Sequence, residues 1–154
     1  MLDALIVKQL KTPLRSAARP LDLVGFTATQ LTLVGAALGI LAAIAIIFDA
    51  LIIAAVLFGS NRLFDGLDGA LARLQGPTER GAFLDITCDF LVYSGIPLAF
   101  AIRDPSVALA AAFLLFSFVG TGSSFLAFSI FAARHRLENQ ALKEKSIYYL
   151  QGLT

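Results

Sequence analysis

The stretch DGLDGALARLQGPTERGAFLDITCD, residues 65–89, places four aspartates around a short turn in a chain that is otherwise strongly apolar. Gln75-Gly76-Pro77 marks the turn, because glycine and proline end one helix and proline can open the next. At about 100° per residue, Asp65 and Asp68 share a face of the helix before the turn, and Asp85 and Asp89 share a face of the helix after it. We therefore expect the two helices to pack as an antiparallel hairpin on which the four carboxylates meet.

The composition of the whole chain is that of a membrane protein. Of its 154 residues, 58% are hydrophobic and 15% are charged, whereas a soluble domain carries about 25% charged residues. Four segments, residues 31–48, 50–74, 78–102 and 107–133, are each long enough to cross a hydrocarbon layer of about 30 Å, with some thinning or tilt. The sequence thus predicts an all-α integral membrane bundle with four spans, occupying residues 23–137.

Residues 1–22 are expected to form an amphipathic juxtamembrane helix. Four basic residues and two prolines interrupt any apolar core, so the segment is not a signal peptide. Leu2, Leu5, Ile6 and Leu10 recur at helical spacing, with basic residues on the opposite side. Such a helix can lie in the headgroup plane near anionic lipid, and an ordinary surface helix is the alternative. Residues 138–154 are more polar and are expected to be a cytoplasmic segment that leads to further spans.

Basic residues indicate the orientation of the spans. Arg103 alone falls on one side of the four-span arrangement. The other side collects ten basic residues: Lys8, Lys11, Arg15, Arg19, Arg73, Arg80, Arg134, Arg136, Lys143 and Lys145. The amino terminus and the turn at Gln75 are therefore expected in the cytoplasm, and the aspartates with them.

Four carboxylates at membrane depth repel one another unless they are paired or hold cations. Arg62 and Arg73 can offset part of their charge. The chain has one cysteine, Cys88, and one histidine, His135, and neither forms a metal-binding pattern with the acids. An all-oxygen ligand set favours Mg²⁺, Mn²⁺ or Ca²⁺ over Zn²⁺, and four acids could hold two such ions as a clamp on a phosphate group.

The residues around the acids are small, which leaves room for a ligand or for close helix packing. They are Gly66, Gly69, Ala70, Ala72, Gly81 and Ala82. A divalent-cation transporter is the alternative class, because intramembrane acids also mark ion paths. An inactive scaffold is a third option. The net charge of +1 gives no indication of a nucleic-acid partner.

The stretch resembles the signature of the CDP-alcohol phosphotransferase family, D-x2-D-G-x2-A-R followed after seven to eight residues by G-x3-D-x3-D. Every fixed position is matched, by Asp65, Asp68, Gly69, Ala72, Arg73, Gly81, Asp85 and Asp89. The resemblance implies a metal-dependent membrane enzyme, usually of six spans, active in phospholipid biosynthesis. Such enzymes transfer a substituted phosphate from a CDP-linked donor, often CDP-diacylglycerol, to an alcohol and release CMP. The implied partners are this donor, a small alcohol and membrane lipids, with a homodimer left open.

By motif position, the resemblance also implies roles for individual residues. Asp65, Asp68 and Asp85 would bind two divalent ions, Mg²⁺ or Mn²⁺, and Asp89 would complete that site and take the proton of the acceptor hydroxyl. The implied substrate-binding residues are Gly69, Ala72, Arg73, Thr78, Gly81 and Thr32, the last of which matches the threonine of an Asn-x2-Thr pattern in the family. Arg62 is a candidate second phosphate contact, and the alternative for Arg62 is a charge partner of the acids.

The acceptor alcohol is marked by a partial resemblance only. Ser94-Gly95 and Pro97 are similar to the Ser-Phe-Gly and following Pro of phosphatidylserine synthases, which favours serine. Phosphatidylglycerophosphate synthases often have Lys directly after the last motif aspartate, where this chain has Phe90. Glycerol 3-phosphate, inositol, inositol phosphate and choline stay open as alternatives.

Overall fold

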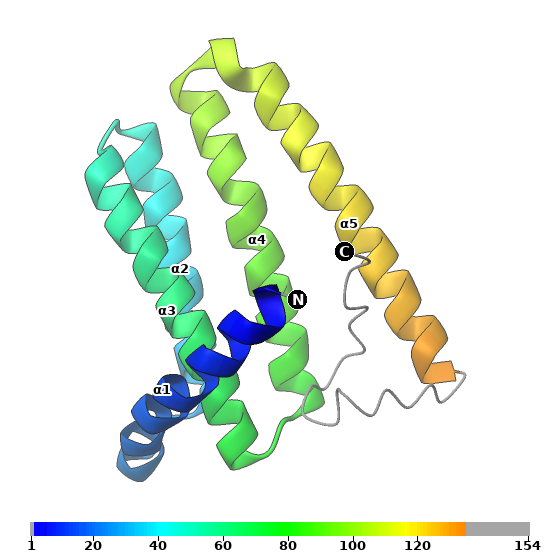
Figure 1. Ribbon diagram of the computed structural model, residues 1–154. Helices are drawn as coiled ribbons and strands as arrows, with labels where there is room; N and C mark the ends of the chain where they lie inside the picture. Colours follow the sequence, from blue (N-terminus) through cyan, green and yellow to red (C-terminus); the bar gives the residue numbers. More distant parts are fainter. Residues whose placement is uncertain (1, 135–154) are drawn as a thin grey trace.

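The computed structural model describes the backbone of residues 2–134 and the side chains of residues 13–131. Within this range the chain is helical, which confirms the predicted all-α class (Figure 1). Its elements are α1 (Leu2–Val24), α2 (Ala28–Ile47), α3 (Leu51–Gln75), α4 (Glu79–Arg103), the short 3₁₀ helix η1 (Pro105–Val107) and α5 (Ala108–Arg134). The predicted polar segment at 138–154, which includes Lys143 and Lys145, lies outside the described residues. His135 and Arg136, just before it, lie outside them too.

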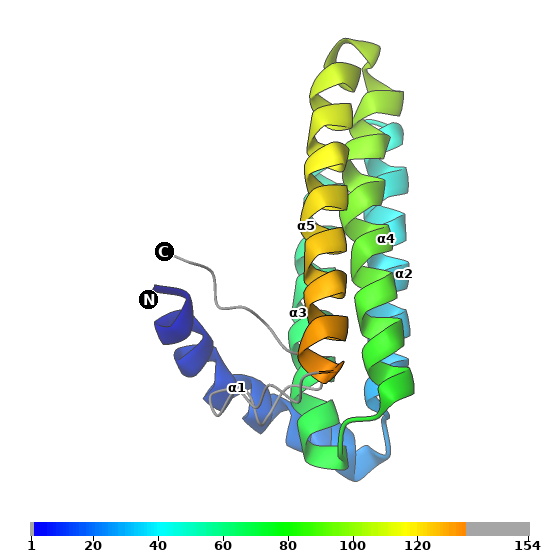
Figure 2. The same ribbon diagram turned by 90° about the vertical axis from the view of Figure 1, so that its right-hand side faces the viewer.

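Three parts of the described chain are long and apolar enough to cross a membrane: α2, α4 and the segment Pro105–Phe131. Helix α3 is as long as α4, but Arg62, Asp65 and Asp68 interrupt its middle, whereas residues 90–102 of α4 carry no charge. Its composition therefore does not identify it as a span. It nevertheless lies alongside α2 in the bundle (Figures 1 and 2). The fourth predicted span thus rests on the position of α3 rather than on its apolarity.

The expected hairpin of α3 and α4 is held by side-chain contacts, such as that of Arg62 with Asp89, rather than by closely packed backbones. Helix α2 packs against both of them, while α1 packs on α3 and α5 packs on α4. Two glycines one turn apart on α2 explain this arrangement, because small residues let helix backbones approach closely. A Cβ on Gly35 would lie 3.2 Å from Cβ of Phe64 in α3, and a Cβ on Gly39 would lie 2.5 Å from Cγ2 of Val92 in α4.

Helix α1 confirms the predicted amino-terminal helix, which continues through Pro13 and Pro20. It leaves the end of the bundle at an angle to the other helices (Figure 2). Ala18 is fully buried in a cluster with Ala70 and Leu71 of α3. The position of α1 in the headgroup plane stays a prediction.

The side chain of Gln75 joins the two turns at one end of the bundle. Its Nε2 donates to Asp22 Oδ1 at 2.9 Å and to the Phe26 carbonyl at 2.7 Å, and its Oε1 accepts from the Ala28 amide at 3.3 Å. The last residue of α3 is thereby tied to the turn between α1 and α2. Gly76 follows with a φ of +92°, a backbone conformation that suits glycine.

At the opposite end of the bundle, Asp49 ends α2 with a φ of +62°. The Asp49 amide donates to the Ile46 carbonyl at 3.0 Å and the Ala50 amide to the Ala45 carbonyl at 2.9 Å, as in a Schellman cap. Arg103, the last residue of α4, donates from Nε and Nη2 to Asp49 Oδ1 at 2.7 and 2.6 Å. The single basic residue predicted for this side therefore holds the α2–α3 turn against α4.

Candidate metal and substrate site

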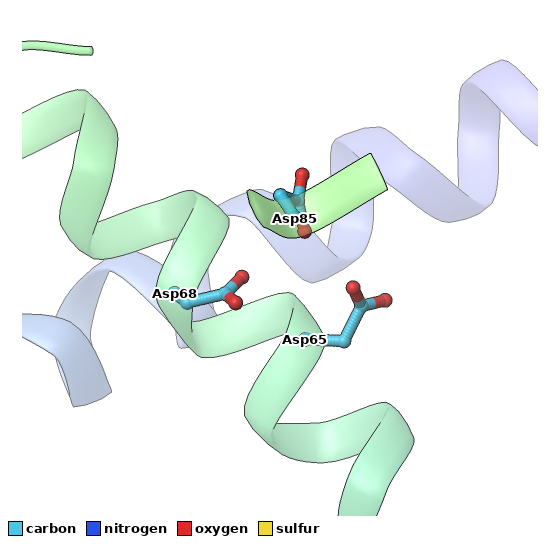
Figure 3. Close-up of side chains that lie close together, drawn as sticks. All are labelled: Asp65, Asp68 and Asp85. Atoms are coloured by element: carbon cyan, nitrogen blue, oxygen red, sulfur yellow. The ribbon is translucent and has the colours of Figure 1, made fainter. Parts of the chain in front are cut away.

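Three of the four aspartates converge, two of them from α3 and one from α4. One carboxylate oxygen each from Asp65, Asp68 and Asp85 lie within 4.8 Å of one another. Figure 3 shows the side chains of Asp65 and Asp68 leaving α3 toward Asp85 of α4. This confirms that the acidic faces of the two helices meet. The donor atoms are all carboxylate oxygens, the type that Mg²⁺ and Mn²⁺ prefer.

Helix α2 contributes a hydroxyl to this cluster. Thr32 Oγ1 donates to Asp68 Oδ2 at 2.6 Å, in a buried hydrogen bond. Asp68 is 4% exposed and Thr32 is 8% exposed, so the bond orients the carboxylate that solvent reaches least. The structure thus places Thr32 beside a candidate metal ligand, and its contact with a nucleotide stays a prediction.

Asp89 is held by an arginine on the facing helix, which also approaches Asp65. Arg62 Nη2 donates to Asp89 Oδ1 at 3.0 Å, and Arg62 Nη1 lies 3.6 Å from Asp65 Oδ2. Two roles were considered for Arg62, a phosphate contact and a charge partner of the acids. These contacts support the second. Arg62 is the side chain that links α3 to α4 at Asp89.

Two residues that hold Arg62 were not predicted from the sequence. Arg62 Nη1 donates to Tyr93 Oη at 2.6 Å, and Arg62 Nε donates to Asn61 Oδ1 at 2.8 Å. The signal for both is helical spacing: Tyr93 follows Asp89 by four residues, and Asn61 precedes Asp65 by four. Each therefore extends an acidic row by one helical turn.

A small open pocket contains all four aspartates and is walled by α2, α3 and α4. Its lining comprises Thr32, Gly35, Ala36, Asn61, Asp65, Asp68, Asp85, Cys88 and Asp89. Asn61 is buried, and its Nδ2 donates to the Gly35 carbonyl at 2.9 Å. The wall on the α2 side is therefore backbone and small side chains.

The other predicted substrate-binding residues lie toward the α3–α4 turn and outside the lining of this pocket. Ala72 is half-buried, and Arg73 is exposed in the last turn of α3. A Cβ on Gly69 would lie 3.6 Å from Arg73 Nη1. Across the turn, Thr78 caps α4, and its Oγ1 accepts from the Gly81 amide at 3.0 Å. The predicted nucleotide contacts thus form a second group next to the acids.

Arg73 forms no ion pair or hydrogen bond with a side chain that the structure describes. Its guanidinium stands exposed one helical turn beyond Gly69. Arginine presents a planar fork of donors that matches a phosphate.

Comparison with known proteins agrees with these features. The sequence model described as CDP-alcohol phosphatidyltransferase matches residues 26–149. The chain is 48% identical to the "Inner membrane protein YnjF" of Escherichia coli (strain K12), over all of this chain and 75% of that protein. No solved structure matches the chain significantly.

Two further relatives are named as synthases, and the chain matches half or less of each. The archaetidylinositol phosphate synthase of Pyrococcus horikoshii is 34% identical over 61% of this chain and 50% of its own length. The phosphatidylinositol phosphate synthase of Corynebacterium glutamicum is 51% identical over 41% of this chain and 30% of its own length. Both names refer to inositol phosphate, so the comparisons do not support the expected preference for serine.

Proposed function

The chain belongs to the CDP-alcohol phosphatidyltransferase family, and from that premise we propose that it transfers a phosphatidyl group from CDP-diacylglycerol to an alcohol and releases CMP. The observation that carries the proposal is the meeting of Asp65, Asp68 and Asp85 within 4.8 Å, beside a pocket that also contains Asp89. Several carboxylates around one open pocket suit cations that bind a pyrophosphate.

The donor set fits two divalent ions of the Mg²⁺ or Mn²⁺ type. Asp65, Asp68 and Asp85 would hold them, and Asp89 would complete the second position. Bound ions of this kind stabilise the negative charge that develops on the pyrophosphate and on the departing CMP. Thr32 supports the site by fixing the orientation of Asp68.

The side chains of the protein would bind the donor and move one proton. The acceptor oxygen attacks the phosphorus next to the lipid, and the bond from that phosphorus to the oxygen of CMP breaks. The hydroxyl proton passes to the carboxylate of Asp89, which lines the pocket. Arg73 would bind a phosphate of the nucleotide with its fork of donors, while Gly69 and Gly81 leave space for the cytidine.

Inositol phosphate is the acceptor that we propose to test first. The support is that two relatives are named as synthases of inositol phosphate lipids. Glycerol 3-phosphate and inositol are the next candidates. We further propose that the site faces the cytoplasm, because Arg15, Arg19, Arg73 and Arg80 are at the same end of the bundle.

A turnover assay with radiolabelled CDP-diacylglycerol in membranes tests the proposal. We expect CMP release that requires Mg²⁺ or Mn²⁺ and one acceptor of the panel, and that falls by at least about 100-fold in Asp89→Asn, as when a positioned proton acceptor is lost. Asp104→Asn is the matched control, because Asp104 is an exposed aspartate at the far end of α4. Full activity of Asp89→Asn would contradict the assigned role. Metal uptake into vesicles without CMP release would favour the transporter.

A further inference from the structure

We propose that Arg62 is an internal counter-ion that occupies Asp89 until a second divalent cation displaces it, and that Tyr93 and Asn61 hold Arg62 in this position. The inference rests on the metal site of the proposed function and deepens it. It assigns Tyr93 and Asn61 as positioning residues and makes metal binding at Asp89 a competition with an arginine.

The contacts of Arg62 use all three nitrogens of the guanidinium. Nη2 donates to Asp89, Nη1 donates to Tyr93 Oη at 2.6 Å, and Nε donates to Asn61 Oδ1 at 2.8 Å. The guanidinium carbon also lies 4.6 Å from the centroid of the Tyr93 ring and 5.5 Å from that of Phe58, within the range of cation–π contacts. The side chain is therefore fixed from both α3 and α4.

This fixation strengthens the ion pair with Asp89. A partly exposed ion pair is usually weak because two flexible side chains must be held in one geometry. Here the Tyr93 hydroxyl and the Asn61 amide oxygen already hold the guanidinium, so less side-chain freedom is lost when Arg62 pairs with Asp89.

The arrangement separates the four acids before any cation binds. Asp65, Asp68 and Asp85 form a group whose oxygens lie close together, whereas Asp89 is engaged by Arg62 at 3.0 Å. Asp65 of this group also lies 3.6 Å from Arg62, a longer contact than the 3.0 Å contact of Asp89. A first cation held by the group of three would therefore disturb Arg62 less than a cation that needs Asp89. A second cation that uses Asp89 must break the ion pair, so Arg62 weakens the second binding step more than the first.

The test is a titration of the full-length chain in nanodiscs with Mn²⁺, without nucleotide. The electron paramagnetic resonance signal of free Mn²⁺ measures how much of the ion is bound. In Tyr93→Phe, we expect the second Mn²⁺ to bind roughly three- to tenfold more tightly, the change that loss of a typical hydrogen bond produces. The first Mn²⁺ should change by less than about twofold. Arg62→Lys keeps the charge but not the fork, and should shift the second step in the same direction.

Ser94→Ala is the matched control for Tyr93→Phe. It removes a hydroxyl from the next residue of α4, where Ser94 Oγ donates to the Phe90 carbonyl of its own helix at 2.7 Å. Its Mn²⁺ curve should coincide with that of the wild type. Thermal unfolding of each variant checks that a shift in binding is not a loss of fold.

Two outcomes would overturn the inference, and they are distinguishable. If Tyr93→Phe and Arg62→Lys bind two Mn²⁺ ions as the wild type does, Arg62 is not a competitor, and the proposed function is unaffected. If the wild-type chain binds no Mn²⁺, the metal site of the proposed function fails together with the inference. Tighter binding of the second ion in both variants, with an unchanged first step, supports the inference.

Discussion

Replacing Gly39 with alanine tests how closely α2 must approach α4. A Cβ at this position would lie 2.5 and 2.7 Å from the two γ-carbons of Val92, about 1 Å closer than the optimal separation of carbon atoms. Val92 is 3% exposed, and its β-branched side chain is restricted to few rotamers. It therefore cannot move aside, and the two helices must separate.

The magnitude follows from a comparison with Gly95→Ala. Gly95 lies on α4, and its added Cβ would meet Ala43 Cβ at 3.9 Å, an ordinary contact. Both substitutions gain about 1 kcal/mol of helix propensity, so this contribution cancels in the difference. The remaining cost is the overpacking at Val92, about 1–3 kcal/mol. Gly39→Ala should therefore unfold roughly 2–12 °C below Gly95→Ala, at about 2–4 °C per kcal/mol.

The assay is thermal unfolding of the detergent-solubilised variants, followed by size-exclusion chromatography after heating. CMP release should also fall in Gly39→Ala, because the acidic pocket begins one helical turn away on both helices. Gly35, one turn before Gly39, and Cys88, one turn before Val92, both line it. Val92→Ala should partly rescue Gly39→Ala: it removes both γ-carbons and leaves the Val92 Cβ at 3.1 Å. If Gly39→Ala is as stable as Gly95→Ala, the close approach of α2 and α4 is refuted.

Two further substitutions probe single side chains. Thr32→Val removes the buried donor to Asp68 and should destabilise the fold by about 1–3 kcal/mol and raise the metal concentration needed for CMP release, whereas Thr32→Ser keeps the hydroxyl and should behave like the wild type. Gln75→Ala removes the contacts with Asp22, Phe26 and Ala28 and should cost about 1 kcal/mol and speed proteolysis at Gly25. Gln75→Glu should be worse, because it places a carboxylate beside Asp22. Equal proteolysis rates in all three proteins would contradict this role of Gln75.

The positions of the helices were predictable from the sequence because their signals are local. The turns at Asp49, Gln75-Gly76-Pro77 and Asp104 separate α2, α3, α4 and η1–α5 where the sequence predicted breaks. A helix repeats every 3.6 residues, so the spacing of Asp65 and Asp68, and of Asp85 and Asp89, fixes which acids share a face. The meeting of the acids followed from this periodicity and from the short turn.

The partners of each helix could not be predicted in the same way. Periodicity identifies a face but not the helix that covers it, and in a bundle several pairings bury similar apolar surface. The choice depends on the shapes of side chains far apart in the sequence, such as Gly39 against Val92. For this reason the backbone of α2, rather than that of α4, lies closest to α3.

The same distinction applies to the site. Residue type and spacing in the sequence are sufficient to propose four acids, an all-oxygen metal site and a phosphate-binding arginine at Arg73. Three contacts of the site join residues that are 27 to 36 positions apart in the sequence. They are the ion pair of Arg62 with Asp89, the hydrogen bond of Arg62 with Tyr93 and the hydrogen bond from Thr32 to Asp68. Those contacts exist because tertiary packing brings three helices around one pocket, and the local periodicity of a single helix carries no information about them.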